Sequence, residues 1–201
     1  MEAIVKPLKA EHYPEAVDLY TEAFSADPLF IFAFPEKAQR LRLTRIMYEF
    51  VVYEMVTKLD LVLKGAFIGN TLTGCVIYTT PDSSGWNDSM NEAIDKMRKK
   101  ARDERINLIG EYARLNKYST DVEHFYGNEL AVGADYRMHG IGKLLNDSMV
   151  DECMKHRSAR GIIIDTANEK NVKTYLKWGW QLKTSGMFYD IKYFAFWLPV
   201  K

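Results

Sequence analysis

The sequence has little of what marks a secreted, membrane-spanning or nucleic-acid-binding protein. Its only two cysteines, Cys75 and Cys153, are too few for a disulfide framework, so we expect buried thiols in a reducing compartment. No apolar run reaches the length of a membrane span. The polar start, MEAIVKPLKAEHY, does not look like a signal peptide. These absences predict a cytoplasmic protein without a membrane partner.

An excess of charge of one sign is also missing. The 27 lysines and arginines are balanced by 27 aspartates and glutamates. This balance argues against nucleic acid as the main partner and against a polybasic membrane-binding surface. A chain of 201 residues with 47% hydrophobic residues can bury a sizeable core. Because no repeat, low-complexity segment or linker interrupts it, we predict a single domain over residues 1–201.

The hydrophobic periodicity predicts strands and helices that follow one another along the chain. Strands are expected at 3–7, 61–68, 72–80, up to Val132, at 161–165, 180–183 and 188–198. Helices are expected at 11–24, 36–58, 88–118, from about 141 to 157, and after Asn168. Residues 24–35, with four phenylalanines and two prolines, are expected to form a loop.

The most informative segment is Asn128–Leu145, with the sequence NELAVGADYRMHGIGKLL. A short strand runs into a glycine-bearing loop and then into a helix. The first N–H groups of a helix are unpaired and its dipole is positive there, so such a junction binds anions. Glycines let a phosphate approach the backbone closely. The predicted phosphate-binding residues are Arg137, Met138, His139, Gly140, Ile141, Gly142 and Lys143.

Two common phosphate-binding patterns fit this segment poorly. A P-loop needs a glycine five residues before the Gly142-Lys143 pair and Ser or Thr after it, but the chain has Arg137 and Leu144 there. A dinucleotide fingerprint needs Gly or Ala where Leu145 stands, although an acidic residue, Asp165, follows at a suitable distance. A dinucleotide-binding oxidoreductase is therefore weakened as an alternative. The pattern that fits is R-x-x-G-x-G between a strand and a helix.

A second segment, Gly161–Leu182, adds a spaced set of residues after a buried strand. The set consists of Asn168, Asn171, Tyr175, Gly179 and Trp180. Together with R-x-x-G-x-G, it resembles the GNAT superfamily of acyl-CoA-dependent N-acyltransferases, and the close resemblance covers roughly Glu123 to Leu182. The triplets His124-Phe125-Tyr126 and Asp165-Thr166-Ala167 resemble a subgroup that includes antibiotic-modifying acetyltransferases.

The resemblance implies an α/β fold with a central mixed, mostly antiparallel sheet flanked by helices. Its parallel strands near Val132 and Gly161 would splay apart and leave backbone groups for the pantetheine arm of acetyl-CoA. The implied activity is acetyl transfer from acetyl-CoA to a primary amine of a small molecule by direct attack. Besides the loop, the implied cofactor-binding residues are Leu130, Ala131, Val132, Asn168, Asn171 and Tyr175.

Acetyl transfer needs a neutral amine and a proton for the departing thiolate. By resemblance, the phenol of Tyr175 serves the thiolate. Glu129 is our first candidate for the general base, because an acidic residue is unusual in an apolar strand run. His124, Tyr126 and Asp165 remain open as alternatives. Glu129 is inert if the strand turns it toward solvent.

Three further expectations concern metal binding, the acceptor pocket and a possible dimer surface. No metal-ligand spacing occurs among the four histidines and two cysteines. Segment 24–34, which holds Asp27, walls the acceptor pocket or packs in the core. The aromatic segment 188–198 packs in the core or forms a homodimer surface. A non-catalytic acyl-CoA-binding sensor of the same fold remains the alternative function.

Overall fold

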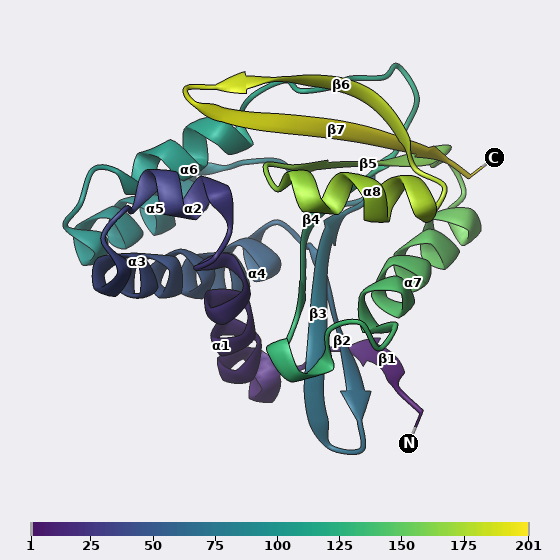
Figure 1. The fold of residues 1–201 in the computed structure, drawn as a ribbon, viewed down its shortest axis with the longest axis horizontal. Coiled ribbons are helices and arrows are strands. Elements are labelled where there is room, and N and C mark those ends of the chain that lie inside the picture. Colours follow the sequence, from purple (N-terminus) through teal and green to yellow (C-terminus); the bar gives the residue numbers. More distant parts are fainter. Residues whose placement is uncertain (1, 201) are drawn as a thin grey trace.

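The computed structural model describes residues 2–200, and these form one seven-stranded sheet with helices on both faces (Figure 1). The strand order is β1-β2-β3-β4-β5-β7-β6, and every neighbouring pair is antiparallel except β4 and β5. The strands are β1 (Ile4–Pro7), β2 (Val62–Ile68), β3 (Thr71–Thr79), β4 (Phe125–Val132), β5 (Gly161–Thr166), β6 (Gln181–Phe188) and β7 (Ile191–Pro199). The predicted mixed, mostly antiparallel sheet is confirmed.

The helices divide between the two faces of the sheet and give two apolar cores. One core lies under α1 (Tyr13–Phe24), α2 (Pro28–Ala33), α3 (Lys37–Glu49), α4 (Val56–Lys58), α5 (Asp88–Ala101) and α6 (Ile106–Ala113). The other lies under α7 (Ile141–Lys155) and α8 (Glu169–Lys177). Strand β3 shows how the sheet separates them: Cys75 and Ile77 enter the first core, while Val76 and Tyr78 enter the second.

The predicted aromatic loop at 24–35 is wrong, because it contains helix α2. The Asp27 side chain accepts a hydrogen bond from the N–H of Leu29 at 2.9 Å and caps this helix, and Pro28 occupies its first position. Asp27 and Pro28 together mark a helix start, but the two prolines and four phenylalanines of the segment had suggested a loop. Phe30 and Phe34 are buried, so the segment also packs in the core.

The single helix predicted at 88–118 is also wrong. Helix α5 ends at Ala101, since Arg102 adopts a left-handed conformation with φ of 52°. Asp103 then accepts a hydrogen bond from the N–H of Arg105, and α6 begins at Ile106. An arginine does not mark a helix end in the sequence as a glycine would, so the apolar residues on both sides of Arg102 were predicted to belong to one helix.

Two other predictions need smaller corrections. The helix at 36–58 is continuous, but its middle, Phe50–Met55, is a π-helix labelled η2. The closing strands have different limits, because β6 runs on to Phe188 before the turn at Tyr189. Two 3-10 helices, η1 (Ala10–His12) and η3 (Ala134–Tyr136), precede α1 and α7.

Both cysteines are buried, as the sequence predicted; the Cys153 thiol donates to the carbonyl of Gly161 at 3.3 Å. Over residues 2–200 no helix combines the length and the apolarity that crossing a membrane requires.

Candidate functional site

Strands β4 and β5 pair over only three residues and then separate. Their parallel register joins Phe125–Gly127 to Ile162–Ile164, and the rest of β4 has no partner on that side. A β-bulge interrupts the pairing of β4 with β3 between Gly127 and Glu129. A bulge bends its strand and increases the twist, so it accounts for the separation. The predicted splay is confirmed, and it exposes main-chain groups of Asn128–Val132 to a ligand.

The loop after β4 presents a helix N-terminus without a side-chain cap. Gly140 takes the cap position of α7 with φ of 84°, a left-handed conformation that suits glycine. The carbonyl of Gly140 accepts from the N–H of Leu144. Within residues 2–200, the N–H groups of Ile141, Gly142 and Lys143 make no such bond. They are therefore available to an anion.

The side chains of the loop are mostly engaged elsewhere. Arg137 donates through Nε to the carbonyl of Val132 at 3.2 Å, and Lys143 pairs with Asp147 at 2.5 Å. His139 contacts the carbonyl of Arg137 through Nδ1 at 2.7 Å, and Met138 is fully exposed. The anion-binding capacity of this loop is thus largely that of the main chain.

The two asparagines of the second motif have different surroundings. Asn168 caps α8 by accepting from the N–H of Lys170 at 3.1 Å, a role that needs no ligand. Asn171 donates to the hydroxyl of Thr166 at 3.2 Å and lines a cavity beside the separated strands. Gly179, with φ of 92°, ends the helix as its position predicted.

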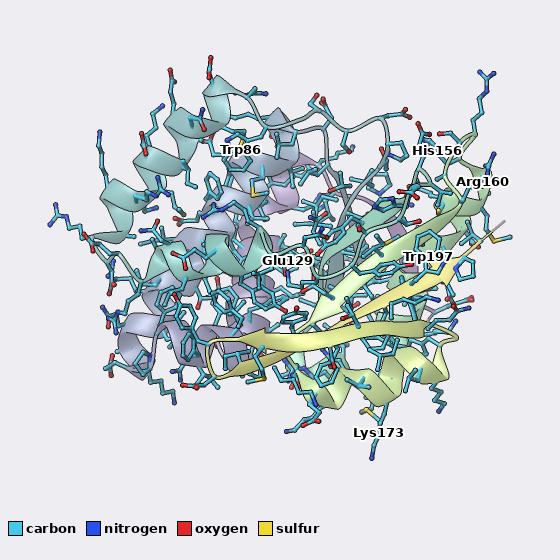
Figure 2. All side chains as sticks on the ribbon, turned by 90° about the horizontal axis from the view of Figure 1, so that it is seen from above. Trp86, Glu129, His156, Arg160, Lys173 and Trp197 are labelled. Carbon is cyan, nitrogen blue, oxygen red and sulfur yellow. The ribbon has the colours of Figure 1, made fainter. Side chains whose placement is uncertain are left out.

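A cavity of about 570 Å³ begins where β4 and β5 separate. It extends along α2, α3 and the π-helix η2 and reaches α5 and α6. This size lies in the range of about 300–1,000 Å³ that is usual for small-molecule sites. In Figure 2, Glu129 lies near the middle of the molecule and Trp86 toward the side of α5, and both residues line the cavity.

Glu129 points into this cavity. Ala131, two residues on, enters the α1–α6 core, so the alternation of β4 sends Glu129 to the same face. The Tyr48 hydroxyl donates to Glu129 Oε2 at 3.1 Å. Burial raises the pKa of Glu129 to about 8; the negative charges of Asp165 and Asp27 add to this rise, and the Tyr48 hydrogen bond opposes it. Glu129 therefore faces the cavity and not solvent, and its role as base stays a prediction.

Asp165 is the centre of a second polar cluster on the cavity wall. It accepts hydrogen bonds from the hydroxyls of Tyr126 and, at 2.8 Å, Tyr112. Lys117 lies 3.3 Å from Asp165 Oδ2 and donates to the Tyr112 carbonyl at 2.8 Å. Burial lowers the pKa of the Lys117 amine, which Asp165 partly offsets. Asp165 thus has three partners on the cavity wall, whereas the Glu129 side chain has the Tyr48 hydroxyl.

Tyr175 lines the cavity from α8. Its ring packs edge-on against Trp178, Trp180 and Phe196, with ring centroids 5.4–6.2 Å apart. The hydroxyl forms no hydrogen bond with any other part of residues 2–200. Burial, together with nearby carboxylates, raises the pKa of this phenol. The phenol therefore stays protonated and able to donate.

The structure also brings in residues that the sequence did not assign to the site. Tyr48, Tyr112 and Lys117 come from α3, α6 and the segment after it, and no local motif marks them. Asp27, noted only as part of the aromatic segment, also lines the cavity. Conversely, His124 contacts the Val122 carbonyl and does not line the cavity, which removes it as a base candidate. Among the described residues no acidic, histidine or cysteine group is arranged to hold a metal ion.

Comparisons with known proteins agree with this geometry. The model of the "Acetyltransferase (GNAT) family" matches residues 17–180. A search of curated proteins finds no match. Among solved structures, one from Corynebacterium glutamicum, titled histone acetyltransferase HPA2 and related acetyltransferase, has a TM-score of 0.75 at 16% identity and covers 99% of this chain and 97% of its own.

Two further structures have the same fold. The ribosomal-protein-S18-alanine N-acetyltransferase of Escherichia coli has a TM-score of 0.59 at 12% identity, covering 99% of this chain and 94% of its own. Arabidopsis thaliana NAA60, in complex with acetyl-CoA, also has a TM-score of 0.59, at 14% identity and 99% coverage of both chains. At these identities the likeness concerns the fold.

Proposed function

The chain belongs to the acetyltransferase (GNAT) family, and we propose that it transfers the acetyl group of acetyl-CoA to a primary amine of a small molecule. The observation that carries the proposal is that Glu129 and Tyr175 line one cavity at the splay of β4 and β5, while the same strand β4 leads on to the uncapped N-terminus of α7. Each supplies one requirement of acetyl transfer: a base, a donor for the thiolate and a site for the pyrophosphate.

The residues present fit acetyl-CoA. The N–H groups of Ile141–Lys143 can receive phosphate oxygens, and the open edge of Asn128–Val132 can pair with the pantetheine amides. Asn171 and Tyr175 line the inner end of this path. Bound acetyl-CoA supplies the thioester whose acetyl carbon the acceptor amine attacks.

Glu129 acts on the acceptor. An amine with a pKa of about 10.4 enters as an ammonium ion and must lose a proton before it can attack. The Glu129 carboxylate accepts that proton, directly or through one water, and its pKa of about 8 suits a base that works near neutral pH. Tyr48 holds the carboxylate in place through its hydrogen bond.

Tyr175 acts on the sulfur side. A phenol whose pKa is raised by burial is a weak acid, so its main contribution is a hydrogen bond to the departing thiolate.

The resemblance to antibiotic-modifying enzymes makes amine antibiotics reasonable members of an acceptor panel.

The test is CoA release in the presence of amines, with identification of the acetylated product. We expect kcat/KM to rise with pH through about 8, because the base must be ionised. Glu129→Gln, which keeps an acceptor for Tyr48, should reduce turnover by roughly a hundredfold or more. Acetyl-CoA binding without turnover of any amine would favour the alternative, a non-catalytic acyl-CoA sensor.

A further inference from the structure

The cavity contains more carboxylates than one proton transfer needs. Glu129 from β4, Asp165 from β5 and Asp27 from the turn before α2 all line it, with Lys117 as the nearby cation. Asp165 is balanced by Lys117 and by two tyrosine hydroxyls. Asp27 has no such partner, because its only side-chain bond within residues 2–200 is the helix cap to the N–H of Leu29.

The surroundings of Asp27 indicate which kind of group would neutralise its charge. Burial raises the pKa of this carboxyl to about 6, with the Leu29 N–H opposing the rise and the charge of Asp165 adding to it. The carboxyl is therefore ionised at neutral pH, and no cation pairs with it within residues 2–200. The negative charge of a buried carboxylate is stabilised by a nearby cation.

The cavity beyond the carboxylates is lined by apolar side chains from several helices. Phe30 of α2, Met47 of α3, Phe50 and Met55 of the π-helix and Met97 of α5 face it. Methionine side chains are flexible and adapt to different apolar shapes. Arg98, which pairs with Asp95 at 3.4 Å, and Arg114 also line the cavity and add positive charge to its wall. A second ammonium group on the ligand would thus meet an apolar wall and then like charge.

We propose that the acceptor is a monocationic amine with an apolar body, and that Asp27 binds its ammonium group while the body lies against α2, α3 and α5. This inference rests on the proposed function and names the substrate class of the same cavity. It makes Asp27 a specificity-determining residue: Asp27 and Glu129 line the same cavity and their charges interact, so the ammonium group lies between the two carboxylates and gives its proton to Glu129 before it attacks the thioester. A longer acyl chain is the other apolar occupant, but it has no charge to offer Asp27.

Asp27→Asn is the appropriate variant. Asparagine caps a helix as well as aspartate, so α2 keeps its start while the charge is removed. Asp151→Asn on the exposed surface of α7 is the matched control. The probes are 2-phenylethylamine, ethylamine without the apolar body, phenylalanine with an added carboxylate, and spermidine with further ammonium groups.

We expect kcat/KM for 2-phenylethylamine to exceed that for ethylamine roughly ten- to a hundredfold, as for burial of one aromatic side chain. Phenylalanine and spermidine should be poorer acceptors. Asp27→Asn should raise KM for 2-phenylethylamine roughly ten- to a hundredfold, as for loss of a hydrogen bond to a charged group, with kcat changed little. Asp151→Asn should behave as the parent.

The pH profile gives a readout that a structural role would not change. The titratable groups that face Asp27 are Glu129 on β4, Asp165 on β5, Tyr48 on α3, Tyr112 on α6 and Tyr175 on α8. The tyrosines stay protonated well above neutral pH. In the parent, 1/KM should fall as pH decreases through about 6, since protonation removes the charge of Asp27. In Asp27→Asn this fall should disappear.

Several outcomes would overturn the inference while the proposed function stands. These are an unchanged KM in Asp27→Asn, a preference for spermidine or phenylalanine, or a preference for hexanoyl-CoA over acetyl-CoA. If no amine is acetylated, the proposed function fails. Isothermal titration of 2-phenylethylamine into the protein with CoA present then decides the inference by itself: binding that weakens in Asp27→Asn supports it, and absence of binding overturns it.

Discussion

At the scale of single residues, the site depends on carboxyl groups that are buried, so that their ionised form is energetically unfavourable. Glu129 and Asp27 lie in a cavity where burial raises the pKa of both carboxyls, and the charge of Asp27 raises the pKa of Glu129 further. Such residues are stabilised by substrate rather than by the fold, so they are expected to reduce stability where they are ionised. Tyr175 is different, because a neutral phenol costs little to bury beside apolar rings.

The first residue-scale prediction concerns Glu129 and stability. Its pKa is about 8 in the folded protein and about 4.5 when unfolded, so the folded state holds an extra proton between these values. The free energy of unfolding should therefore fall as pH rises from about 5 to 8, on the order of a few kcal/mol. In Glu129→Gln this fall should be smaller, with a higher Tm than the parent near pH 8 and a similar Tm near pH 5. Thermal unfolding at both pH values is the measurement, and equal pH dependence of the two proteins would contradict the assignment.

The second residue-scale prediction is that Tyr175→Phe reduces kcat by roughly ten- to a thousandfold, as for loss of one hydrogen-bonding or acid group. Folding and acetyl-CoA affinity should change little, because the ring keeps its contacts and the hydroxyl has no partner within the described chain. Steady-state kinetics and thermal unfolding measure the two effects. Tyr189→Phe, at the exposed turn between β6 and β7, is the matched control. Near-parent turnover in Tyr175→Phe would refute its role at the sulfur.

At the scale of elements, the site is made by two interruptions of regular structure. The bulge in β4 bends the strand away from β5, and Gly127 allows the close approach just before it, since a Cβ there would lie 2.8 Å from Ile164 Cγ2. The start of α7 at Gly140 leaves N–H groups unpaired. The π-helix η2 is a third irregularity, and it turns Phe50 and Met55 toward the cavity.

The element-scale prediction compares two glycines with left-handed backbones and open surroundings. Gly140 has φ of 84° and Gly69, in the β2–β3 turn, has φ of 61°. Alanine at either position should reduce stability by about 1–2 kcal/mol. Only Gly140→Ala should weaken CoA binding, by roughly tenfold or more, because relaxation of the loop turns the α7 N–H groups away from the pyrophosphate. Isothermal titration with CoA separates the two, and equal affinities would place the pyrophosphate elsewhere.

Gly142 should respond for a different reason. A Cβ there would lie 3.4 Å from the Trp178 ring and 3.6 Å from Val132 Cγ2, in ordinary contact. Gly142→Ala is therefore expected to fold normally. A larger side chain, as in Gly142→Val, would fill the gap between β4 and α8 that the pantetheine path requires.

At the scale of the whole molecule, the cavity lies between parts that are distant in sequence. The proposed base comes from β4, the proposed hydrogen-bond donor to the thiolate from α8, and the other cavity walls from α2, α3, α5 and α6. The proposed binding surface for acetyl-CoA likewise combines β4, α7 and α8. A ligand that contacts all of these elements binds the folded state alone and stabilises it by mass action.

The whole-molecule prediction is a rise in Tm with acetyl-CoA. At about 100 times its Kd, a ligand adds about 2.7 kcal/mol to the free energy of unfolding. For a chain of this length that corresponds to roughly 5–10 °C. NAD at the same concentration should give no shift, which separates the acyltransferase from a dinucleotide-binding protein. Differential scanning measurements with both ligands test this directly, and a shift with NAD alone would reverse the assignment.

The sequence by itself determined the elements whose signals are local. The strand-loop-helix at Asn128–Leu145, the cap at Asn168 and the C-cap at Gly179 are all set by residues within a few positions of one another. These motifs were enough to predict the family and the splayed strands. Only the tertiary structure decided which side chains surround the cavity, because packing brings Asp27 from the turn before α2 and Lys117 from the segment after α6 to its wall, and Tyr48 of α3 to Glu129. The break at Arg102 likewise depends on a backbone conformation that its residue type does not indicate.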